Sequence, residues 1–204
     1  MAQQPEAVLF DLGNVIIQVH FERCFAIWGK AIGKTPAEVA ALYKFDDAYC
    51  AHELAAITVE EYHAHVAKLL GADLSFPDFV IGWMAILGDV IEETRQLILD
   101  LKKHYKLYVL TNSNVIHREV WSVQHRELLV HFDHVFCSSV IKERKPDAAC
   151  FQAICTAVNL TPGQILFTDD LLTNIVAAQK FGLQTMLFDD PPMVVAKLRR
   201  RLLR

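Results

Sequence analysis

Five short apolar segments, each ending abruptly in polar residues, constrain the fold of this chain more than any other feature. They are rich in β-branched and aromatic residues and have the length of a strand, which is typical of strands buried on both faces of a parallel sheet. The segments are AVLFD (7–11), KLYVLTN (106–112), HVFCSS (134–139), QILFTDD (164–170) and QTMLFDD (184–190). The sequence therefore predicts one buried parallel sheet that contains all five.

The stretches between the later segments have the length and apolar spacing of amphipathic helices. In DVIEETRQLILDLKKHY (89–105), five side chains fall near one face of a helix. They are Val90, Thr94, Leu97, Ile98 and Leu101. Strand and helix alternate in this way to the end of the chain. The alternation predicts the α/β class, with a doubly wound, Rossmann-like parallel sheet.

The chain between the first two segments reads as a helical block. Two capping boxes mark helix starts inside it: Thr35 with Glu38, where Pro36 occupies the first helical position, and Thr58 with Glu61. Apolar residues recur at helical spacing after Thr58. The sequence thus predicts helix throughout this block.

The position of the helical block divides the chain into two parts. We expect residues 1–17 and 87–204 to form an α/β catalytic core, and residues 18–86 to form a small inserted helical cap. A cap that admits a substrate and then excludes water has to move. Its hinge is expected near residues 15–20 and 84–90.

Composition and charge exclude several classes of protein. The formal net charge of −4 and the pI near 6.1 lack the basic excess that accompanies binding to a phosphate backbone, so we expect no nucleic-acid partner. No apolar run approaches the roughly 18 residues of a membrane span, and the first residues do not resemble a signal peptide. We therefore expect a cytoplasmic protein with no membrane partner. The five cysteines include no C-x-x-C pair, which predicts reduced thiols.

Polar side chains gather where the predicted strands end. Ligands of an open parallel sheet bind at the carboxyl ends of its strands, so these residues form one candidate site. Carboxylates follow the first and fourth segments, a hydroxyl and an amide end the second, and an ammonium group follows the third. The residues are Asp11, Thr111, Asn112, Lys145, Asp169 and Asp170.

Four motifs carry a resemblance that covers nearly the whole chain. FDLGNV (10–15), VLTN (109–112), RKP (144–146) and LFTDDLLTNI (166–175) are similar, in this order, to the motifs of the haloacid dehalogenase superfamily of phosphotransferases and hydrolases. The inserted block resembles the small cap of that superfamily. Three stretches, FDLGNVI, HELAAIT (52–58) and DDLLTNI (169–175), are similar to the bacterial sugar-phosphate phosphatases that include alpha-D-glucose-1-phosphate phosphatase.

The resemblance implies a Mg²⁺-dependent phosphatase that acts on small phosphorylated metabolites, in particular sugar phosphates such as hexose 1-phosphates. Asp11 would be the nucleophile and would form an aspartyl-phosphate intermediate, which splits one displacement into two easier steps. Asp11, Asp170 and the backbone carbonyl of Gly13 would hold the Mg²⁺, together with waters.

The resemblance also implies roles for the remaining residues of the site. Lys145 and Thr111 would act on the phosphoryl group, and Asn112 would bind the phosphate with them. Asp169 and Asn174 would support the site by orienting the metal ligand and the lysine.

Gly13 departs from the pattern of the superfamily, because most of its phosphatases carry an Asp two residues after the nucleophile. That Asp protonates the leaving alcohol and then activates water. One interpretation is a phosphatase whose leaving group needs little help, such as an anomeric oxygen. A water, or His20, His52 or Glu53 from the cap, would then replace the missing acid.

Two other interpretations of Gly13 remain open. The first is a 2-haloacid dehalogenase-type hydrolase, which attacks carbon; the carboxylates of Asp169 and Asp170 disfavour it, because without a cation they would repel Asp11. The second is a module that binds a phosphorylated ligand without turnover, which would not need the nucleophile.

Aromatic residues are expected to build the core of the cap, with one or two of them facing the substrate. They are Phe21, Phe25, Trp28, Tyr43, Phe45, Tyr49 and Trp83.

Overall fold

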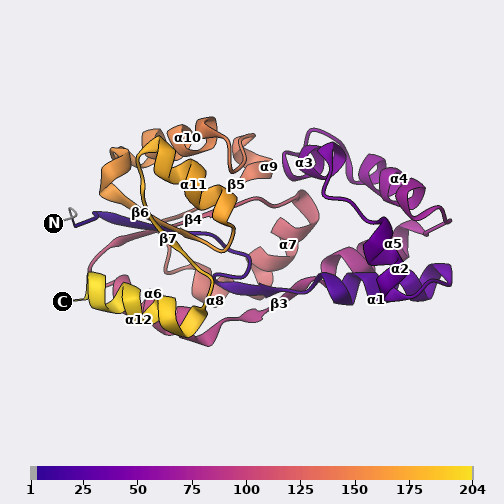
Figure 1. Ribbon diagram of the computed structural model, residues 1–204, viewed down its shortest axis with the longest axis horizontal. Helices are drawn as coiled ribbons and strands as arrows, with labels where there is room; N and C mark the ends of the chain where they lie inside the picture. The colour runs from indigo at the N-terminus through magenta and orange to yellow at the C-terminus, as the bar shows by residue number, and fades with distance from the viewer. Residues whose placement is uncertain (1–3, 204) are drawn as a thin grey trace.

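The computed structural model describes residues 4–203 and contains a five-stranded sheet with the order β5-β4-β1-β6-β7 (Figure 1). All four pairs of neighbouring strands are parallel. The strands are β1 (Ala7–Phe10), β4 (Lys106–Thr111), β5 (His134–Cys137), β6 (Ile165–Asp169) and β7 (Gln184–Leu187). The five predicted segments are therefore confirmed as one sheet, and the predicted α/β class is confirmed with them.

Helices cover both faces of this sheet. Residues of β1 divide between the two layers, since Val8 and Phe10 pack into one apolar cluster and Leu9 into the other. The first layer contains α6 (Glu92–Leu101), α7 (Val115–Gln124), α8 (Arg126–Leu129) and α12 (Pro191–Leu202). The second contains α10 (Ala148–Val158) and α11 (Leu172–Phe181). The short helices α9 (Ser138–Ile141) and η1 (Pro162–Gln164) precede α10 and β6.

A separate helical lobe lies at the carboxyl end of the sheet (Figure 1). Its helices are α1 (Phe21–Ile32), α2 (Pro36–Leu42), α3 (Asp47–Glu53), α4 (Val59–Leu70) and α5 (Phe76–Met84). The lobe has its own aromatic core, in which the ring of Trp28 stacks against Phe79 and Trp83 at centroid distances of 5.5 and 5.8 Å. Both predicted capping boxes are present, with Thr35 and Thr58 accepting from the backbone N–H of Glu38 and Glu61.

An antiparallel two-stranded ribbon joins the lobe to the sheet, and the sequence reading missed it. β2 (Ile17–Val19) pairs with β3 (Leu87–Val90). The prediction of helix throughout the inserted block is therefore wrong at its start. The helix predicted over 89–105 is also too long, because Val90 pairs with Ile17 and α6 covers only Glu92–Leu101. Strands of three and four residues are too short for apolar alternation to reveal them in the sequence.

The ribbon lies at the residues where the cap boundaries and the hinge were predicted. The division of the chain into core and cap at residues 17/18 and 86/87 stays a prediction. Within the described residues, all five cysteines are free. No helix in residues 4–203 is long and apolar enough to cross a membrane.

Candidate active site

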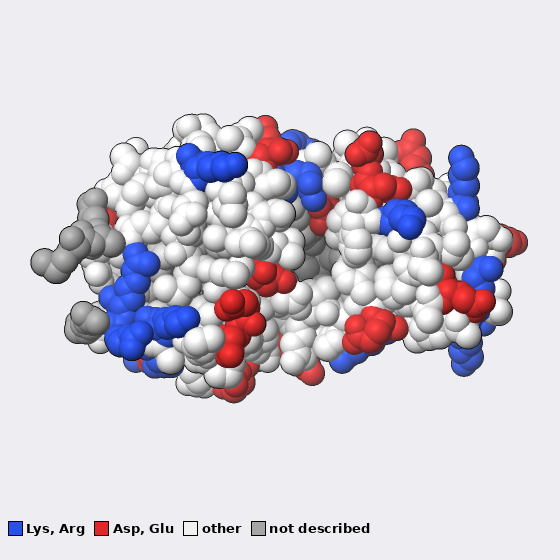
Figure 2. Space-filling model, in the orientation of Figure 1, with Lys and Arg blue, Asp and Glu red and all other residues white. Residues whose placement is uncertain are grey.

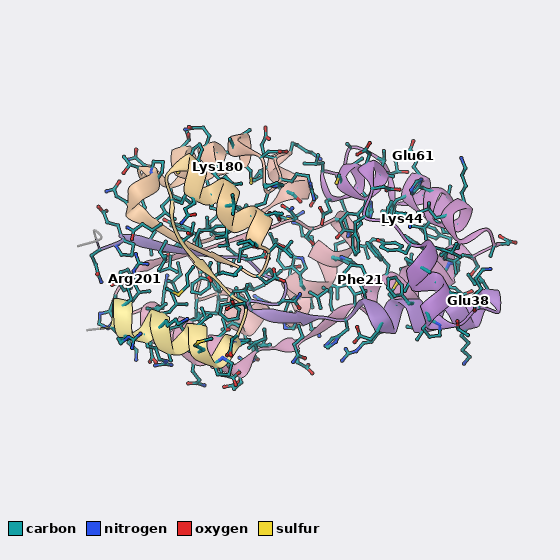
Figure 3. All side chains as sticks on the ribbon, in the orientation of Figure 1. Phe21, Glu38, Lys44, Glu61, Lys180 and Arg201 are labelled. Atoms are coloured by element: carbon teal, nitrogen blue, oxygen red, sulfur yellow. The ribbon has the colours of Figure 1, made fainter. Side chains whose placement is uncertain are left out.

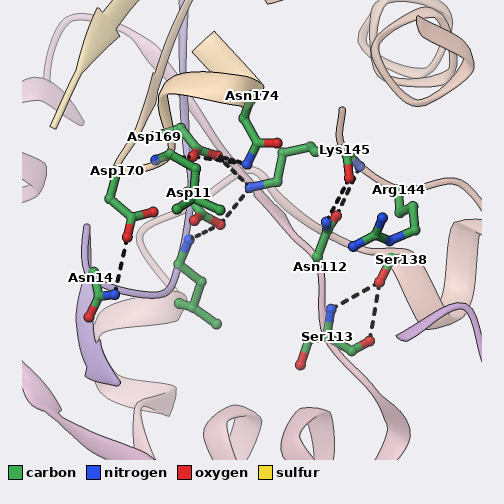
Figure 4. Close-up of polar contacts among 12 residues, drawn as sticks. Asp11, Asn14, Asn112, Ser113, Ser138, Arg144, Lys145, Asp169, Asp170 and Asn174 are labelled. Atoms are coloured by element: carbon green, nitrogen blue, oxygen red, sulfur yellow. Dashed lines mark hydrogen bonds and ion pairs between the residues drawn. The ribbon is translucent and has the colours of Figure 1, made fainter. Parts of the chain in front are cut away.

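The polar residues predicted from the strand ends come together at the carboxyl edge of the sheet (Figure 4). Asp11 directly follows β1, the central strand, while Thr111 ends β4 and Asp169 ends β6 on either side of it. Lys145 reaches the same point from the loop between α9 and α10. Parallel pairing places the ends of these strands together, although the chain separates them widely.

Lys145 is buried between two carboxylates. Its Nζ lies 2.7 Å from Asp11 Oδ1 and 2.7 Å from Asp169 Oδ2, and its side chain is 2% exposed. Burial alone lowers the pKa of a lysine, but the two carboxylates outweigh it and raise the pKa of Lys145. The ammonium group is therefore permanently charged and fixed beside Asp11.

Asn112 fixes the loop that carries Lys145. Its side-chain amide donates to the backbone carbonyl of Lys145, and its Oδ1 accepts from the backbone N–H of Lys145, both at 2.9 Å. The oxygen and one N–H of the Asn112 side-chain amide are thereby used for positioning, and these two bonds leave its second N–H unused. The phosphate-binding role expected of Asn112 stays a prediction.

Asp169 is fully buried, and hydrogen bonds use both of its carboxylate oxygens. Oδ1 accepts from the backbone N–H of Leu171 at 2.8 Å, and Asn174 Nδ2 donates to Oδ1 and Oδ2 at 3.0 and 3.1 Å. Oδ2 also receives Lys145. These contacts hold the lysine in place, and the supporting roles expected of Asp169 and Asn174 stay a prediction.

Asn14 was not singled out in the sequence, yet it connects Asp170 to the ribbon. Its Nδ2 donates to Asp170 Oδ2 at 3.1 Å, and its Oδ1 accepts from the backbone N–H of Val19 at 3.1 Å. Asn14 has a φ of 53°, in the left-handed region that Asn tolerates better than most residues. The dipeptide Gly-Asn, two residues after a candidate nucleophile, was the available signal.

Three carboxylates at this edge form a group able to hold a cation. One oxygen each from Asp11, Asp169 and Asp170 lie within 4.8 Å of one another. Both hydrogen-bonded contacts of Asp11 end on Oδ1, one from Lys145 and one from the backbone N–H of Leu12 at 2.7 Å. No N–H of the described backbone donates to the Gly13 carbonyl. This set of hard oxygen atoms fits Mg²⁺.

The electrostatics of Asp11 reflect this crowding. Burial is the main cause that raises the pKa of Asp11, to about 7, and the carboxylates of Asp169 and Asp170 act in the same direction against Lys145. Burial likewise raises the pKa of Asp170. A bound cation would add positive charge to that of Lys145 and would favour the ionised carboxylates of Asp11 and Asp170.

A cavity of about 560 Å³ opens above these residues, between the sheet and the helical lobe. Figure 2 shows the surface hollowed at this junction. The core supplies one end of the cavity with Asp11, Thr111, Lys145 and Asp170, and the lobe supplies the other with Phe21, Phe45, Tyr49, Cys50 and Glu53.

Three of the seven aromatic residues named from the sequence line this cavity: Phe21, Phe45 and Tyr49. Phe21 begins α1, close to the ribbon (Figure 3). The other four belong to the aromatic packing of the lobe.

Of the three cap residues considered as replacement acids, only Glu53 lines the cavity. His20 bonds Glu22 and Gln18, and His52 is buried against Tyr62 with ring centroids 4.2 Å apart. Neither histidine is among the lining residues.

Two further lining residues, Arg144 and His117, were given no role from the sequence. Arg144 stands inside the quoted RKP motif, so its position was available as a signal. His117 lies on α7 and offered none.

A parallel α/β sheet that gathers aspartates and a buried lysine under a helical lobe defines an enzyme that uses carboxylate chemistry at the sheet edge. The chain belongs to the haloacid dehalogenase-like hydrolase family, whose model matches residues 5–182. The superfamily expected from the four motifs is therefore confirmed.

Individual relatives are phosphatases. D-ribitol-5-phosphate phosphatase of Bacteroides thetaiotaomicron is 23% identical over 185 residues, covering 87% of this chain and 89% of that protein. A sesquiterpene phosphatase of Aspergillus oryzae is 29% identical over 69 residues, 34% of this chain and 35% of that protein. The family makes the chain a hydrolase, and these relatives support the prediction of a phosphoric monoester hydrolase.

A solved structure agrees with the fold and the metal. A haloacid dehalogenase family enzyme of Bacteroides thetaiotaomicron, in complex with magnesium and inorganic phosphate, is 25% identical, with a TM-score of 0.76 over 90% of this chain and 93% of that chain. Mg²⁺, the predicted cofactor, is thus the ion bound in a structure similar to this one.

Proposed function

We propose that this protein is a Mg²⁺-dependent phosphatase of small phosphorylated metabolites, acting on sugar phosphates such as hexose 1-phosphates through Asp11. The observation that carries the proposal is the Asp11 carboxylate, 2.7 Å from a buried lysine, at the base of a cavity large enough for a small metabolite.

Asp11 is the proposed nucleophile. One of its carboxylate oxygens attacks phosphorus, a bond from Asp11 to phosphorus forms, and the bond from phosphorus to the substrate oxygen breaks, so that this oxygen takes up a proton and leaves as the alcohol. Water then attacks the aspartyl-phosphate, which releases inorganic phosphate and restores the carboxylate. Lys145 supplies fixed positive charge next to the phosphoryl oxygens throughout, and Thr111 and Asn112 bind the same oxygens.

Asp11, Asp170 and the Gly13 carbonyl would hold the Mg²⁺, with Asn14 orienting Asp170 through the hydrogen bond described above. When bound, the ion neutralises charge on the phosphate and on the carboxylates. Asp169 is left to position Lys145, since its oxygens already accept four hydrogen bonds.

Gly13 bears on the choice of substrate. A general acid usually contributes roughly 10²–10⁴-fold to the rate, and Gly13 offers no side chain for proton transfer. A Cβ at this position would meet Val19 Cγ2 at 3.0 Å, so the ribbon packs against the glycine. The anomeric oxygen of a sugar 1-phosphate is a better leaving group than an ordinary hydroxyl, and it loses less from the missing acid.

The test is release of inorganic phosphate from hexose 1-phosphates and 6-phosphates, in Mg²⁺ or in EDTA. We expect Mg²⁺-dependent release that Asp11→Asn abolishes, with the 1-phosphates hydrolysed faster. Asp73→Asn, at an exposed residue of the lobe, is the matched control and should leave the rate unchanged. Release of halide from 2-haloacids, without release of phosphate, would replace this proposal with the dehalogenase alternative. Phosphate binding without turnover would support the binding module.

A further inference from the structure

A charged pair joins the helical lobe to the core at the wall of the cavity. Glu53 ends α3, and Arg144 directly precedes Lys145 in the loop that carries it. Nη2 and Nε of Arg144 donate to the same oxygen, Glu53 Oε2, at 2.8 and 3.3 Å. The side chain of Glu53 is 6% exposed and that of Arg144 is 20% exposed. The pair is therefore largely removed from bulk solvent.

A neighbouring residue helps to hold this pair in one arrangement. Ser138 Oγ donates to the backbone carbonyl of Glu53 at 2.7 Å. In Figure 4, Arg144 lies beside Asn112, on the opposite side of Asp11 from Asp170 and Asn14. Arg144 thus stands apart from the proposed metal ligands Asp170 and Asp11, at the wall of the cavity.

The charges of the pair favour a neutral polar group as its ligand. Glu53 neutralises Arg144, so a second phosphate placed here would meet a carboxylate as well as a guanidinium. Within residues 4–203, Arg144 Nη1 donates no hydrogen bond. A free N–H donor next to a carboxylate acceptor matches a hydroxyl group, which both donates and accepts.

Aromatic rings complete this side of the cavity. Phe45 contacts Phe21 and Tyr49 edge to face, each at a centroid distance of 5.1 Å. Such faces pack against the C–H groups of a polyol while its hydroxyls reach polar partners. The mechanism at Asp11 uses none of these residues, so they are available for recognition.

We propose that Glu53 and Arg144 determine specificity by binding hydroxyl groups of a polyhydroxylated phosphate ester, such as a sugar or alditol phosphate, whose phosphate lies at Asp11 and Lys145. The inference rests on the proposed phosphatase function and adds the residues that read the organic part of the substrate.

The test compares two esters with six carbons and a primary leaving oxygen, glucose 6-phosphate and hexyl phosphate, which differ in their hydroxyl groups. We expect the wild type to prefer glucose 6-phosphate. Glu53→Gln should lower kcat/KM for glucose 6-phosphate about 10- to 100-fold, mainly through KM, because hydrogen bonds to charged groups are of that strength. Hydrolysis of hexyl phosphate should stay within about twofold of the wild type.

Two further variants make the result decisive. Glu143→Gln removes the same charge from a neighbouring residue that does not line the cavity, and it should change neither substrate. Arg144→Lys keeps the charge but loses the fork of donors, and it should reduce selectivity as Glu53→Gln does.

An equal loss on both esters in Glu53→Gln and Arg144→Lys would overturn the inference, because the pair would then only fasten the lobe to the core. An equal loss in Glu53→Gln alone would also overturn it, because Glu53 would then act as the general acid that Gly13 lacks. A wild-type preference for hexyl phosphate would also overturn the inference. If the wild type releases no phosphate from either ester or from p-nitrophenyl phosphate, the proposed function itself fails.

Discussion

At the scale of the residue, the site depends on one buried charge. Lys145 compensates Asp11 and Asp169 at once, at 2.7 Å from each. An ion pair that is removed from water is costly to break, because the remaining charges stay buried without a partner. Lys145 therefore stabilises the folded chain, in addition to its proposed role in catalysis.

We expect Lys145→Met to lower the free energy of unfolding by about 3–5 kcal/mol at neutral pH, because two carboxylates would be left buried together. Urea unfolding measures the loss. Lys106→Met is the matched control, since Lys106 pairs with Asp133 at an exposed position and should cost much less. Similar losses in the two variants would contradict the argument from burial.

At the scale of the element, α7 connects the core to the lobe through His117. Its Nε2 donates to the backbone carbonyl of Trp83 on α5 at 2.8 Å, and its Nδ1 accepts from Asn114 Nδ2 at 2.9 Å. This arrangement requires a neutral ring, because a proton on Nδ1 would face another donor. Burial accordingly lowers the pKa of His117 to about 3.

The lowered pKa predicts how this contact responds to pH. The folded ring stays neutral while an unfolded histidine binds a proton below about pH 6.5, so the free energy of unfolding falls as the pH drops from 6.5 towards 3. Between pH 7.5 and 5.5 we expect the wild type to lose about 1 kcal/mol more than His117→Gln. Urea unfolding at both pH values checks this, with His104→Gln at an exposed position as the control. An identical pH dependence in wild type and His117→Gln would exclude the proposed linkage.

At the scale of the whole molecule, the proposed Mg²⁺ site lies where the sheet, the ribbon and the cavity meet. Asp170 belongs to the core, and Asn14 ties it to the backbone of β2. A cation that binds only the folded chain stabilises it by mass action, and here it would also relieve repulsion among three carboxylates.

We expect MgCl₂ to raise the unfolding temperature relative to EDTA, by the equivalent of about 2.7 kcal/mol at a hundred times the dissociation constant. Asp170→Asn should remove most of this shift, whereas Asp73→Asn should keep it. Differential scanning calorimetry provides the measurement. A shift of equal size in Asp170→Asn would place the ion elsewhere.

The sequence by itself determined the α/β class, the five strands and the residues at their carboxyl ends. A strand buried on both faces is apolar along most of its length, so AVLF before Asp11 and ILF at 165–167 are visible without any contact information. Thr35 and Thr58 were equally visible, because a capping box is a contact between residues three apart.

Only the tertiary structure decided which distant residues meet. The ribbon exists because Ile17 pairs with Val90, and the roles of Asn14, His117 and Arg144 depend on partners from other elements. Glu53 is separated from Arg144 by 91 positions in the chain. No local pattern indicates that Arg144 Nη2 donates to Glu53 Oε2 at 2.8 Å. Local sequence patterns report burial and hydrogen bonds within a few residues, whereas the packing of the lobe on the sheet selects every longer contact.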